Sequence, residues 1–384
     1  MPGTSPTTDP DAPALYIGMM SGTSIDGVDA VLARASSQGL TTIASASLDI
    51  DDALRAELLA LQASGPDEIV RAGVATRRLT DLYADAVDAL LRRARALPDH
   101  ATLAPGDVAA IGAHGQTVRH RPELGFTVQL LDGARLAVRT GITVVNDLRS
   151  ADVAAGGQGA PLAPGFHDAV FRASGCRRAI VNIGGIANVT KLTPGEPALG
   201  FDTGPGNVLM DGWIERHRGT RYDGGGAWAA SARPDPALLR RMLSEPYFAL
   251  PAPKSTGRDL FDMSWLDDRL AGDGQRPEPA VVQATLCELT AVAIADAIRG
   301  ACGGADEVLV CGGGARNAHL MARLARHLAP VSVASTDAVG IDPQAVEALA
   351  FAWLARQRLH GRPGNLPTVT GASRPVVLGA VHAP

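Results

Sequence analysis

A polar turn between two apolar runs, Gly18–Asp29 (GMMSGTSIDGVD), is the stretch that most constrains the fold of this chain. Residues 15–17 before it suit a buried strand and residues 28–32 suit a returning strand, so the segment predicts a hairpin. Its glycines let backbone N–H groups converge on an anion, and its hydroxyls add donors, so the turn can hold phosphate. Asp26 would repel phosphate, but it could orient Mg²⁺ or the water shell of that ion. The alternative is an ordinary hairpin with a polar tip, since the turn has neither the Walker A nor the Rossmann pattern.

Length and composition limit the class of protein. A chain of 384 residues exceeds what one core usually supports, so two domains are expected. With 46% hydrophobic residues, 20% charged residues and a net charge of −5, we expect a soluble globular protein without a basic stripe for nucleic acid. No apolar run is expected to span a membrane, and residues 1–14 are expected to form a disordered extension. The four cysteines show no paired metal spacing, which predicts reduced thiols and a cytoplasmic location.

Periodicity predicts alternating strands and helices along the rest of the chain. Strands are predicted at 41–50, 108–111, 126–131, 142–145 and 307–311, and a strand–turn–strand unit at 179–190. Helices are predicted at 51–61, 67–97, 208–216, 235–243, 281–298, from 318, and at 342–359 with Pro343 in the first turn. The tail from Arg362 is expected to contain two short extended pieces. Because the unit at 179–190 repeats the plan of the opening hairpin, the two domains are expected to be duplicates.

Several polar or glycine-rich loops follow predicted strands, where ligand groups gather at the carboxyl end of a sheet. His114 in HGQT is either a ligand group or a hydrogen-bonded loop histidine. Asp202 precedes the sharp turn GPGN and lies either near bound phosphate or within the turn's own hydrogen bonds. The loop 254–261 (KSTGRDLF) is either an anion-contacting loop or a solvated basic turn. The glycines 312–314 permit either backbone approach to a nucleoside or close packing of strand and helix.

The three glycine-rich elements Gly18–Asp29, Phe201–Asn207 and Val310–Asn317 occur in an order that resembles the superfamily of sugar kinases, actin and heat-shock chaperone ATPases. There, two phosphate loops come from duplicated halves and a third loop contacts adenosine. A closer resemblance, to the anhydro-N-acetylmuramic acid kinase family, is carried by GMMSGTSIDGVDAVL, HGQT, NDLRSADVAAGGQGAPLAP, NIGGIANVT, GFDTGPGN, PKSTGRDLF and CGGGARN. It runs from about Leu15 to the tail. Ile25 and Leu148 stand where we expect Leu and Phe, and neither change removes a chemical group.

The resemblance implies a two-domain α/β actin-like ATPase (ribonuclease H-like) fold, with mixed sheets flanking a central cleft. The domains are expected at 15–150 plus 362–384 and at 151–361. The Gly- and Pro-rich stretch 154–164 is either a hinge or a close-approach loop around a ligand. The implied activity uses ATP and Mg²⁺ to convert 1,6-anhydro-N-acetylmuramic acid to N-acetylmuramic acid 6-phosphate, in peptidoglycan recycling and amino sugar catabolism. Family members form homodimers, so a cytoplasmic homodimer is implied.

The same resemblance assigns roles to individual residues. Asp202 matches the general base, and Asp26 would act on Mg²⁺ through water. The expected ATP contacts are Gly22, Thr23, Ser24, Ile25, Asp26, Gly27, Val28, Asp29, Gly204, Gly206, Asn207, Gly312, Gly313, Gly314 and Asn317. The expected sugar contacts are His114, Asp147, Arg149, Gln158 and Glu347. Arg149 would pair with the lactyl carboxylate of muramic acid, which glucose lacks.

Three alternative functions fit parts of this pattern. The first is another small-molecule kinase of the same fold, which would act on an ordinary hexose hydroxyl. The second is a nucleotide-driven chaperone or binding protein, which would want an appended partner-binding domain that the sequence does not contain. The third is a sugar-sensing regulator, for which the N-terminal extension is too short to bind DNA.

Overall fold

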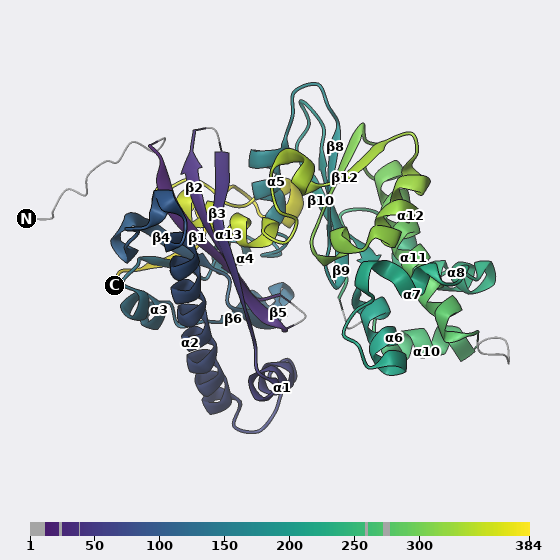
Figure 1. Cartoon of the computed structure of the whole chain (residues 1–384), viewed down its shortest axis with the longest axis horizontal. Helices are drawn as coiled ribbons and strands as arrows, with labels where there is room; N and C mark the ends of the chain where they lie inside the picture. Colours follow the sequence, from purple (N-terminus) through teal and green to yellow (C-terminus); the bar gives the residue numbers. More distant parts are fainter. Residues whose placement is uncertain (1–11, 23–24, 38, 258–259, 272–276) are drawn as a thin grey trace, which may run out of the picture. The chain divides into compact units, whose positions relative to one another are not determined.

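The structure, a computed structural model, describes residues 12–22, 25–37, 39–257, 260–271 and 277–384. The predicted ATP contacts Thr23 and Ser24 lie outside these residues. The chain divides into two compact units (Figure 1). Unit 1 comprises Met1–Phe166 and Glu347–Pro384, and unit 2 comprises His167–Val346.

Unit 1 is built on a mixed six-stranded sheet of order β13-β7-β4-β1-β2-β3. Strands β1, β2 and β3 form an antiparallel meander, β4 and β7 continue the sheet in parallel, and β13 returns antiparallel to β7. The hairpin β5–β6 forms a separate two-stranded sheet. The strands are β1 Ala14–Met20, β2 Gly27–Ser36, β3 Gly39–Asp49, β4 Val108–Ala113, β5 Gln116–Arg121, β6 Phe126–Leu130, β7 Val144–Asn146 and β13 Ala380–His382.

Helices cover both faces of this sheet. The long amphipathic helix α2 lies along β2 and β3 and buries Leu79, Tyr83 and Val87 in the core beneath it (Figure 1). On the other face α13 approaches so closely that a Cβ at Gly18 would lie 1.8 Å from the carbonyl oxygen of Ala348. The helices of this unit are α1 Asp52–Ala60, α2 Glu68–Arg95, α3 Gly133–Thr140, α4 Ser150–Ala154, α5 Ala163–Phe171, which extends into unit 2, α13 Val346–Leu359 and α14 Pro367–Thr370.

Unit 2 repeats this plan in a five-stranded sheet of order β10-β9-β8-β11-β12. Again three strands form an antiparallel meander, and two further strands extend the sheet in parallel. The strands are β8 Arg178–Ile183, β9 Ile186–Leu192, β10 Leu199–Pro205, β11 Glu307–Cys311 and β12 Ser332–Ser335. Because β10-β9-β8-β11-β12 matches β3-β2-β1-β4-β7 in order and direction, the predicted duplication is confirmed.

The apolar helix α11 forms the centre of unit 2. By length and composition it could cross a membrane, which corrects the expectation that no apolar run reaches this length, yet 78% of its apolar window is buried inside the protein. It is therefore the core helix of this unit. The helices are α6 Val208–Arg218, α7 Ala227–Ala230, α8 Pro236–Leu243, α9 Pro246–Ala249, α10 Met263–Leu270, α11 Pro279–Arg299 and α12 Ala318–Leu328. All four cysteines, Cys176, Cys287, Cys302 and Cys311, lie in unit 2 as free thiols, as predicted.

The boundaries of three predicted segments differ in the structure. The return to unit 1 occurs at Glu347, before α13, and not at residue 362, because α13 packs on the sheet of unit 1; the crossing into unit 2 follows Phe166. The helix expected from Asp342 begins at Val346, since Pro343 lies in a preceding turn whose carbonyl accepts the Gly312 N–H at 2.9 Å. The tail contains the short helix α14 and the strand β13 in place of two extended pieces.

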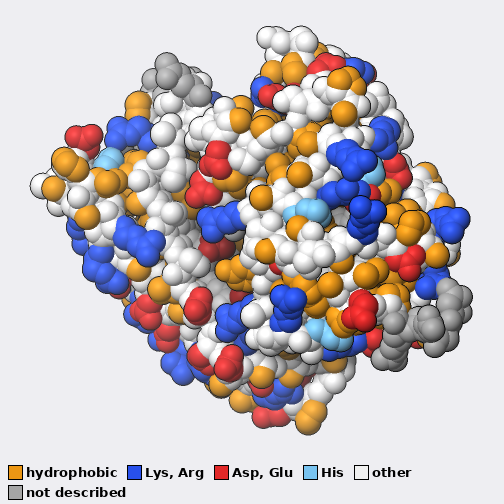
Figure 2. Space-filling view, turned by 45° about the vertical axis from the view of Figure 1, so that its right-hand side comes forward, with side chains coloured by type: hydrophobic (Ala, Val, Ile, Leu, Met, Phe, Trp, Pro, Cys, Tyr) orange, Lys and Arg blue, Asp and Glu red, His pale blue; other side chains and the backbone are white. Residues whose placement is uncertain are grey.

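Charged side chains of both signs are interspersed with apolar ones on the face shown in Figure 2. Many form local ion pairs, such as Arg71–Glu57 at 2.7 Å in unit 1 and Arg216–Asp267 at 2.6 Å in unit 2. Exposed pairs of this kind contribute little to stability, about 0–1 kcal/mol each. The surface charge therefore bears on solubility more than on the fold.

Candidate active site

Ile25, between β1 and β2, anchors this part of the chain to the core of unit 1. Its side chain is fully buried in the core of unit 1, its N–H donates to the Gly22 carbonyl at 3.2 Å, and its φ is +52°. A β-branched residue rarely adopts positive φ, and such strain persists where the surroundings enforce it, often at functional sites. Gly27 begins β2 where a Cβ would lie 2.9 Å from the Leu48 carbonyl oxygen. The core thus holds Ile25 and Gly27 in place, while Asp26 between them is exposed.

In unit 2 the turn after β10 folds against the β8–β9 turn. The N–H groups of Gly206 and Asn207 donate to the carbonyls of Gly185 and Gly184 at 2.9 and 2.8 Å. A Cβ on Gly206 would lie 2.3 Å from the Gly184 oxygen, so only glycine permits this approach. Thr290 of α11 donates to the carbonyls of Pro205 and Gly206 at 3.0 and 2.9 Å. Thr290 was not predicted at the site, although a polar residue within the apolar α11 is a sequence signal for such support.

The glycine-rich loop 312–314 after β11 packs against the end of β8. A Cβ on Gly312, whose φ is +77°, would lie 2.3 Å from Asn182 Oδ1, and one on Gly314 would lie 2.3 Å from the Ile183 side chain. The side-chain amide of Asn207 donates to the Ile183 carbonyl at 3.1 Å. The two glycine-rich elements predicted in unit 2 therefore converge at the carboxyl end of β8. Close packing alone explains Gly312 and Gly314, whereas at Gly313 the nearest atom to a Cβ is Asn207 Nδ2 at 3.5 Å.

Two further predicted ATP contacts have structural roles. Asn317 caps α12, since its side-chain oxygen accepts the Leu320 N–H at 3.0 Å, and it is packed so tightly that a Cβ on Gly226 would lie 2.2 Å from that oxygen. Gly204 has a φ of +140° and lies against the ring of Phe248, where a Cβ would come within 2.7 Å. These contacts do not test whether Asn317 or Gly204 also contacts ATP, so that role stays a prediction.

Asp202 lies on β10 and is held by the segment 254–256. Its N–H donates to the Lys254 carbonyl at 2.9 Å, and its Oδ2 accepts the Thr256 N–H at 3.0 Å. The Tyr247 hydroxyl donates to the Asp202 carbonyl at 2.7 Å. Burial raises the pKa of Asp202 to about 6, although the Thr256 N–H works in the opposite direction. A carboxylate with a pKa close to neutrality suits a general base, because its conjugate acid also transfers its proton readily.

The contacts of Lys254 match neither alternative predicted for the loop 254–261, an anion-contacting loop or a solvated basic turn. Its ammonium group donates to the carbonyls of Tyr247 and Phe248 at 2.9 and 3.0 Å and lies 4.6 Å from the centroid of the Tyr247 ring. Burial lowers its pKa. The lysine therefore fastens the loop internally, and the loop in turn holds Asp202. The residues Arg258 and Asp259 of this loop lie outside the described part of the chain.

In unit 1 the predicted sugar residues His114 and Arg149 are in direct contact. Nε and Nη2 of Arg149 lie 3.0 and 2.8 Å from His114 Nε2, and Nη1 donates to the Gly159 carbonyl at 2.7 Å. Burial lowers the pKa of Arg149 to about 10, against the opposing effect of the negative charges of Glu347 and Asp152. Burial and the Arg149 charge lower the pKa of His114 to about 3, so the ring is neutral at physiological pH. The structure thus brings together His114, Arg149 and the charge of Glu347.

The remaining two predicted sugar residues flank Arg149 on exposed loops. Asp147 has a φ of +50°, a second strained position at a predicted site residue, and its carboxylate accepts the Ser150 hydroxyl at 2.5 Å. Gln158 exposes its side chain while its N–H donates to the Thr370 carbonyl at 2.7 Å.

Asp152, for which no role was predicted, is a fully buried carboxylate that organises this region. Its Oδ2 accepts the Gly159 N–H at 2.7 Å, and its Oδ1 accepts the Asn365 amide and the Thr370 hydroxyl at 2.6 and 2.7 Å. A Cβ on Gly157 would lie 2.2 Å from Oδ2. The stretch 154–164 is therefore fastened to the tail, and its partners are too distant in sequence for local patterns to reveal them.

Comparison with known proteins identifies the family. A family model described as anhydro-N-acetylmuramic acid kinase matches residues 14–384. The chain belongs to the anhydro-N-acetylmuramic acid kinase family. The proteins of this name from Bordetella petrii and Pseudomonas paraeruginosa are 57% and 53% identical to it, over 96% of this chain and 96% and 98% of theirs. Among solved structures, the activator of the 2-hydroxyisocaproyl-CoA dehydratase from Clostridium difficile with bound ADPNP aligns with 90% of this chain and 96% of its own, at 14% identity and a TM-score of 0.46.

Membership of the anhydro-N-acetylmuramic acid kinase family confirms the resemblance on which the residue roles rest. The two-domain α/β sugar-kinase-like fold with mixed sheets is confirmed as well. Every predicted site residue lies within the matched range, and so does the C-terminal tail that fastens the loop 154–164. The individual roles at ATP, Mg²⁺ and sugar stay predictions.

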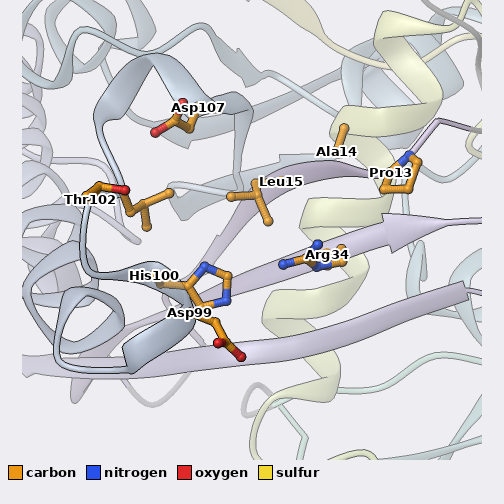
Figure 3. Close-up of a pocket in the computed structure, with 9 residues that line it drawn as sticks. Pro13, Ala14, Leu15, Arg34, Asp99, His100, Thr102 and Asp107 are labelled. Carbon is orange, nitrogen blue, oxygen red and sulfur yellow. The ribbon is translucent and has the colours of Figure 1, made fainter.

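A hollow in unit 1 lies away from the predicted site residues. It has a volume of about 260 Å³ and is lined by Ala14 and Leu15 at the start of β1 and by side chains such as Arg34 and His100 (Figure 3). From there β1 runs about 20 Å before the turn to β2 begins after Met20. Among the described residues that line this hollow, none is a predicted site residue.

The raised pKa of Asp202 predicts an acidic limb in the pH profile of the enzyme. A general base must be deprotonated, so kcat/KM should fall about tenfold per pH unit below a midpoint near the raised pKa of about 6 and level off above it. Initial rates measured between about pH 5 and pH 8 at fixed ionic strength test this. A rate that stays level down to about pH 5, as expected for an unperturbed carboxyl with a pKa near 4, would show that burial does not raise the pKa of the general base.

Proposed function

We propose that this chain is an ATP-dependent kinase that opens 1,6-anhydro-N-acetylmuramic acid with water and phosphorylates it to N-acetylmuramic acid 6-phosphate. The family match over residues 14–384, together with identities above 50% to proteins of that name, carries the proposal. The polar groups that follow the strands also support it, since they include Asp202 with its raised pKa, the glycine-rich turns and the partly buried Arg149.

In the proposed reaction, ring opening and phosphoryl transfer assist each other. The Asp202 carboxylate takes a proton from a water molecule, whose oxygen forms a bond to the anomeric carbon. The bond from that carbon to the bridge oxygen breaks, and the 6-oxygen that is released forms a bond to the γ-phosphorus. The bond from the γ-phosphorus to the β-phosphate oxygen breaks and ADP departs. Because the phosphorus accepts the developing charge on the 6-oxygen, no acid is needed to protonate the leaving group.

The remaining acceleration comes from alignment and charge neutralisation of the phosphoryl group. In the proposed arrangement the turns at Gly22–Asp29 and Gly204–Asn207 hold the phosphates, and Gly312–Gly314 with Asn317 faces adenosine. Asp26, exposed beside the first turn, suits a contact to Mg²⁺ through water, because this ion usually takes one or two carboxylates together with phosphate oxygens and water. Bound Mg²⁺ would neutralise phosphate charge.

On the sugar side, Arg149 is proposed to bind the lactyl carboxylate. A partly buried guanidinium whose hydrogen bonds go to uncharged acceptors is well suited to an anionic ligand. Asp147, Gln158 and Glu347 are proposed as further sugar contacts near it.

We further propose that the enzyme acts in the cytoplasm as a homodimer, in peptidoglycan recycling and amino sugar catabolism, without nucleic acid or membrane partners. The family name fits this setting, since the sugar is a cell-wall fragment. The free cysteines are consistent with a reducing compartment.

Mass spectrometry of the sugar product tests the function directly. After incubation with Mg²⁺, ATP and 1,6-anhydro-N-acetylmuramic acid, the sugar is expected to gain one phosphoryl group and one water. Plain N-acetylmuramic acid, the control acceptor, is expected to remain unchanged. Phosphorylation of glucose-like acceptors with neither muramic sugar modified would favour the alternative of an ordinary hexose kinase and overturn the substrate assignment.

A further inference from the structure

Both ring nitrogens of His114 are engaged within unit 1. Nδ1 lies 2.7 Å from the Gly115 carbonyl oxygen, and Nε2 lies 3.0 and 2.8 Å from Nε and Nη2 of Arg149. The ring is buried, with 6% of the residue exposed, and it packs on Phe351 at a centroid distance of 5.0 Å. These contacts leave no ring nitrogen for a sugar hydroxyl, which argues against the predicted role of His114 as a direct sugar contact.

The chemistry of arginine fixes the tautomer of this histidine. A guanidinium has only donors, so His114 Nε2 must be unprotonated and accept from Arg149. Nδ1 then carries the proton and donates to the Gly115 carbonyl. The neutral form that this requires agrees with the lowered pKa of the ring. His114 is therefore a fixed acceptor, held in one orientation by its own backbone neighbour.

The contacts also define which part of Arg149 faces a ligand. Among the described residues, they engage Nε, one N–H of Nη2 through His114, and one N–H of Nη1 through Gly159. A guanidinium has five N–H groups, so one remains on each terminal nitrogen. Because His114 takes the edge formed by Nε and Nη2, the edge formed by Nη1 and Nη2 is the one at which a carboxylate can bind the guanidinium.

We propose that His114 is a positioning residue that orients the guanidinium of Arg149 toward the carboxylate of the sugar. This inference rests on the proposed function, because it takes the carboxylate from the anhydro-muramic substrate. The Gly115 carbonyl that holds His114 also accepts the hydroxyl of Ser21, at 2.9 Å, and the Ser21 hydroxyl accepts that of Tyr83 at 3.1 Å. The chain of contacts thus fastens the carboxylate-binding arginine to the first residues of the phosphate turn.

A double-mutant cycle on sugar binding tests the proposal. His114→Leu removes the acceptor and should raise KM for the anhydro sugar about tenfold or more, with a much smaller change in kcat and in KM for ATP. Arg149→Met should have a larger effect, and adding His114→Leu to it should change KM little further, because the histidine acts through the arginine. His114→Gln, which offers an amide oxygen as acceptor, should recover part of the loss. Thermal unfolding of each variant identifies any that fail to fold.

The outcomes separate this inference from the proposed function. If the wild-type enzyme leaves the anhydro sugar unmodified, the proposed function fails. If the wild-type enzyme is active but the two substitutions raise KM independently and multiply in the double variant, the positioning role is wrong. The same holds if His114→Leu lowers thermal stability while KM for the sugar is unchanged, since the histidine then serves only the fold. A competing analogue in which the lactyl carboxylate is replaced by a neutral amide should bind wild type and His114→Leu equally.

Discussion

Asp202→Asn is expected to lower kcat by about 10² to 10⁴ while leaving nucleotide affinity unchanged. Asparagine keeps the shape of the side chain and an oxygen that can accept the Thr256 N–H, which lies 3.0 Å from the carboxylate. It cannot accept a proton from water, so the base is lost while the geometry remains. Single-turnover rates with the anhydro sugar, together with ADP binding by calorimetry, measure the two effects separately.

Asp202→Asn should also gain stability. Replacement of a structural aspartate would instead lower stability, so this measurement distinguishes the two roles. Burial raises the pKa of Asp202 in the folded protein to about 6, above the value of 3.8 that an unburied carboxyl has. The folded state therefore binds the proton more tightly, and stability falls as pH rises from about 4 to 6 and stays lowered above that range. Because asparagine carries no charge, Tm above pH 6 should be equal to or higher than that of the wild type. Asp296→Asn, in an exposed pair on α11, serves as the control and should alter neither kcat nor Tm.

Near-wild-type turnover of Asp202→Asn would contradict the assignment of the base. A loss of activity together with a marked fall in Tm would instead point to a structural carboxylate of the kind found at Asp152, which is fully buried and accepts three hydrogen bonds. The acidic limb of the pH profile should disappear in the residual activity of Asp202→Asn.

The fold could be predicted from the sequence because its signals are local. The apolar runs on either side of Gly18–Asp29 and within 179–190 produced the two hairpins, and the repeat between them predicted the duplicated sheets. The boundaries were less accurate where tertiary contacts decide them. The helix α13 joins unit 1 because Gly18 lacks a side chain at that contact, and no periodicity in residues 342–359 reveals this.

Much of the candidate site could also be predicted from the sequence, because glycines and polar residues follow strands whose carboxyl ends lie together. The convergence of Gly206, Asn207 and Gly312 around β8 follows from the sheet order alone. The supporting contacts could not be predicted, since each joins residues far apart in sequence. Lys254 holds the loop at Asp202 by bonding to carbonyls, and Asp152 reaches the tail at Thr370. The role of such a residue depends on the direction in which its side chain points, and the residue type alone does not determine that direction.

Replacement of Arg149 is expected to cost about 10²-fold in KM for the anhydro sugar, the second large effect. Hydrogen bonds to a charged group contribute about 1.5–3 kcal/mol, which corresponds to roughly 10- to 150-fold in affinity. Arg149→Met removes both the charge and the donors of a partly buried group. Arg149→Lys keeps the charge but loses the planar fork, so its KM should lie closer to that of the methionine variant than to wild type. Steady-state kinetics with saturating ATP measures these values.

A matched control distinguishes loss of the carboxylate contact from loss of a buried arginine in general. Arg119 in unit 1 is also partly buried, pairs with Glu68 at 2.7 Å and donates to backbone carbonyls. Arg119→Met should therefore lower Tm without raising KM for the sugar. For Arg149→Met, the ratio of affinities between the natural sugar and its lactyl amide should fall toward one, because the variant no longer recognises the charge. An unchanged ratio would mean that the carboxylate binds elsewhere, and the network of His114, Gly159 and Arg149 would then serve to hold the loop 154–164 in place.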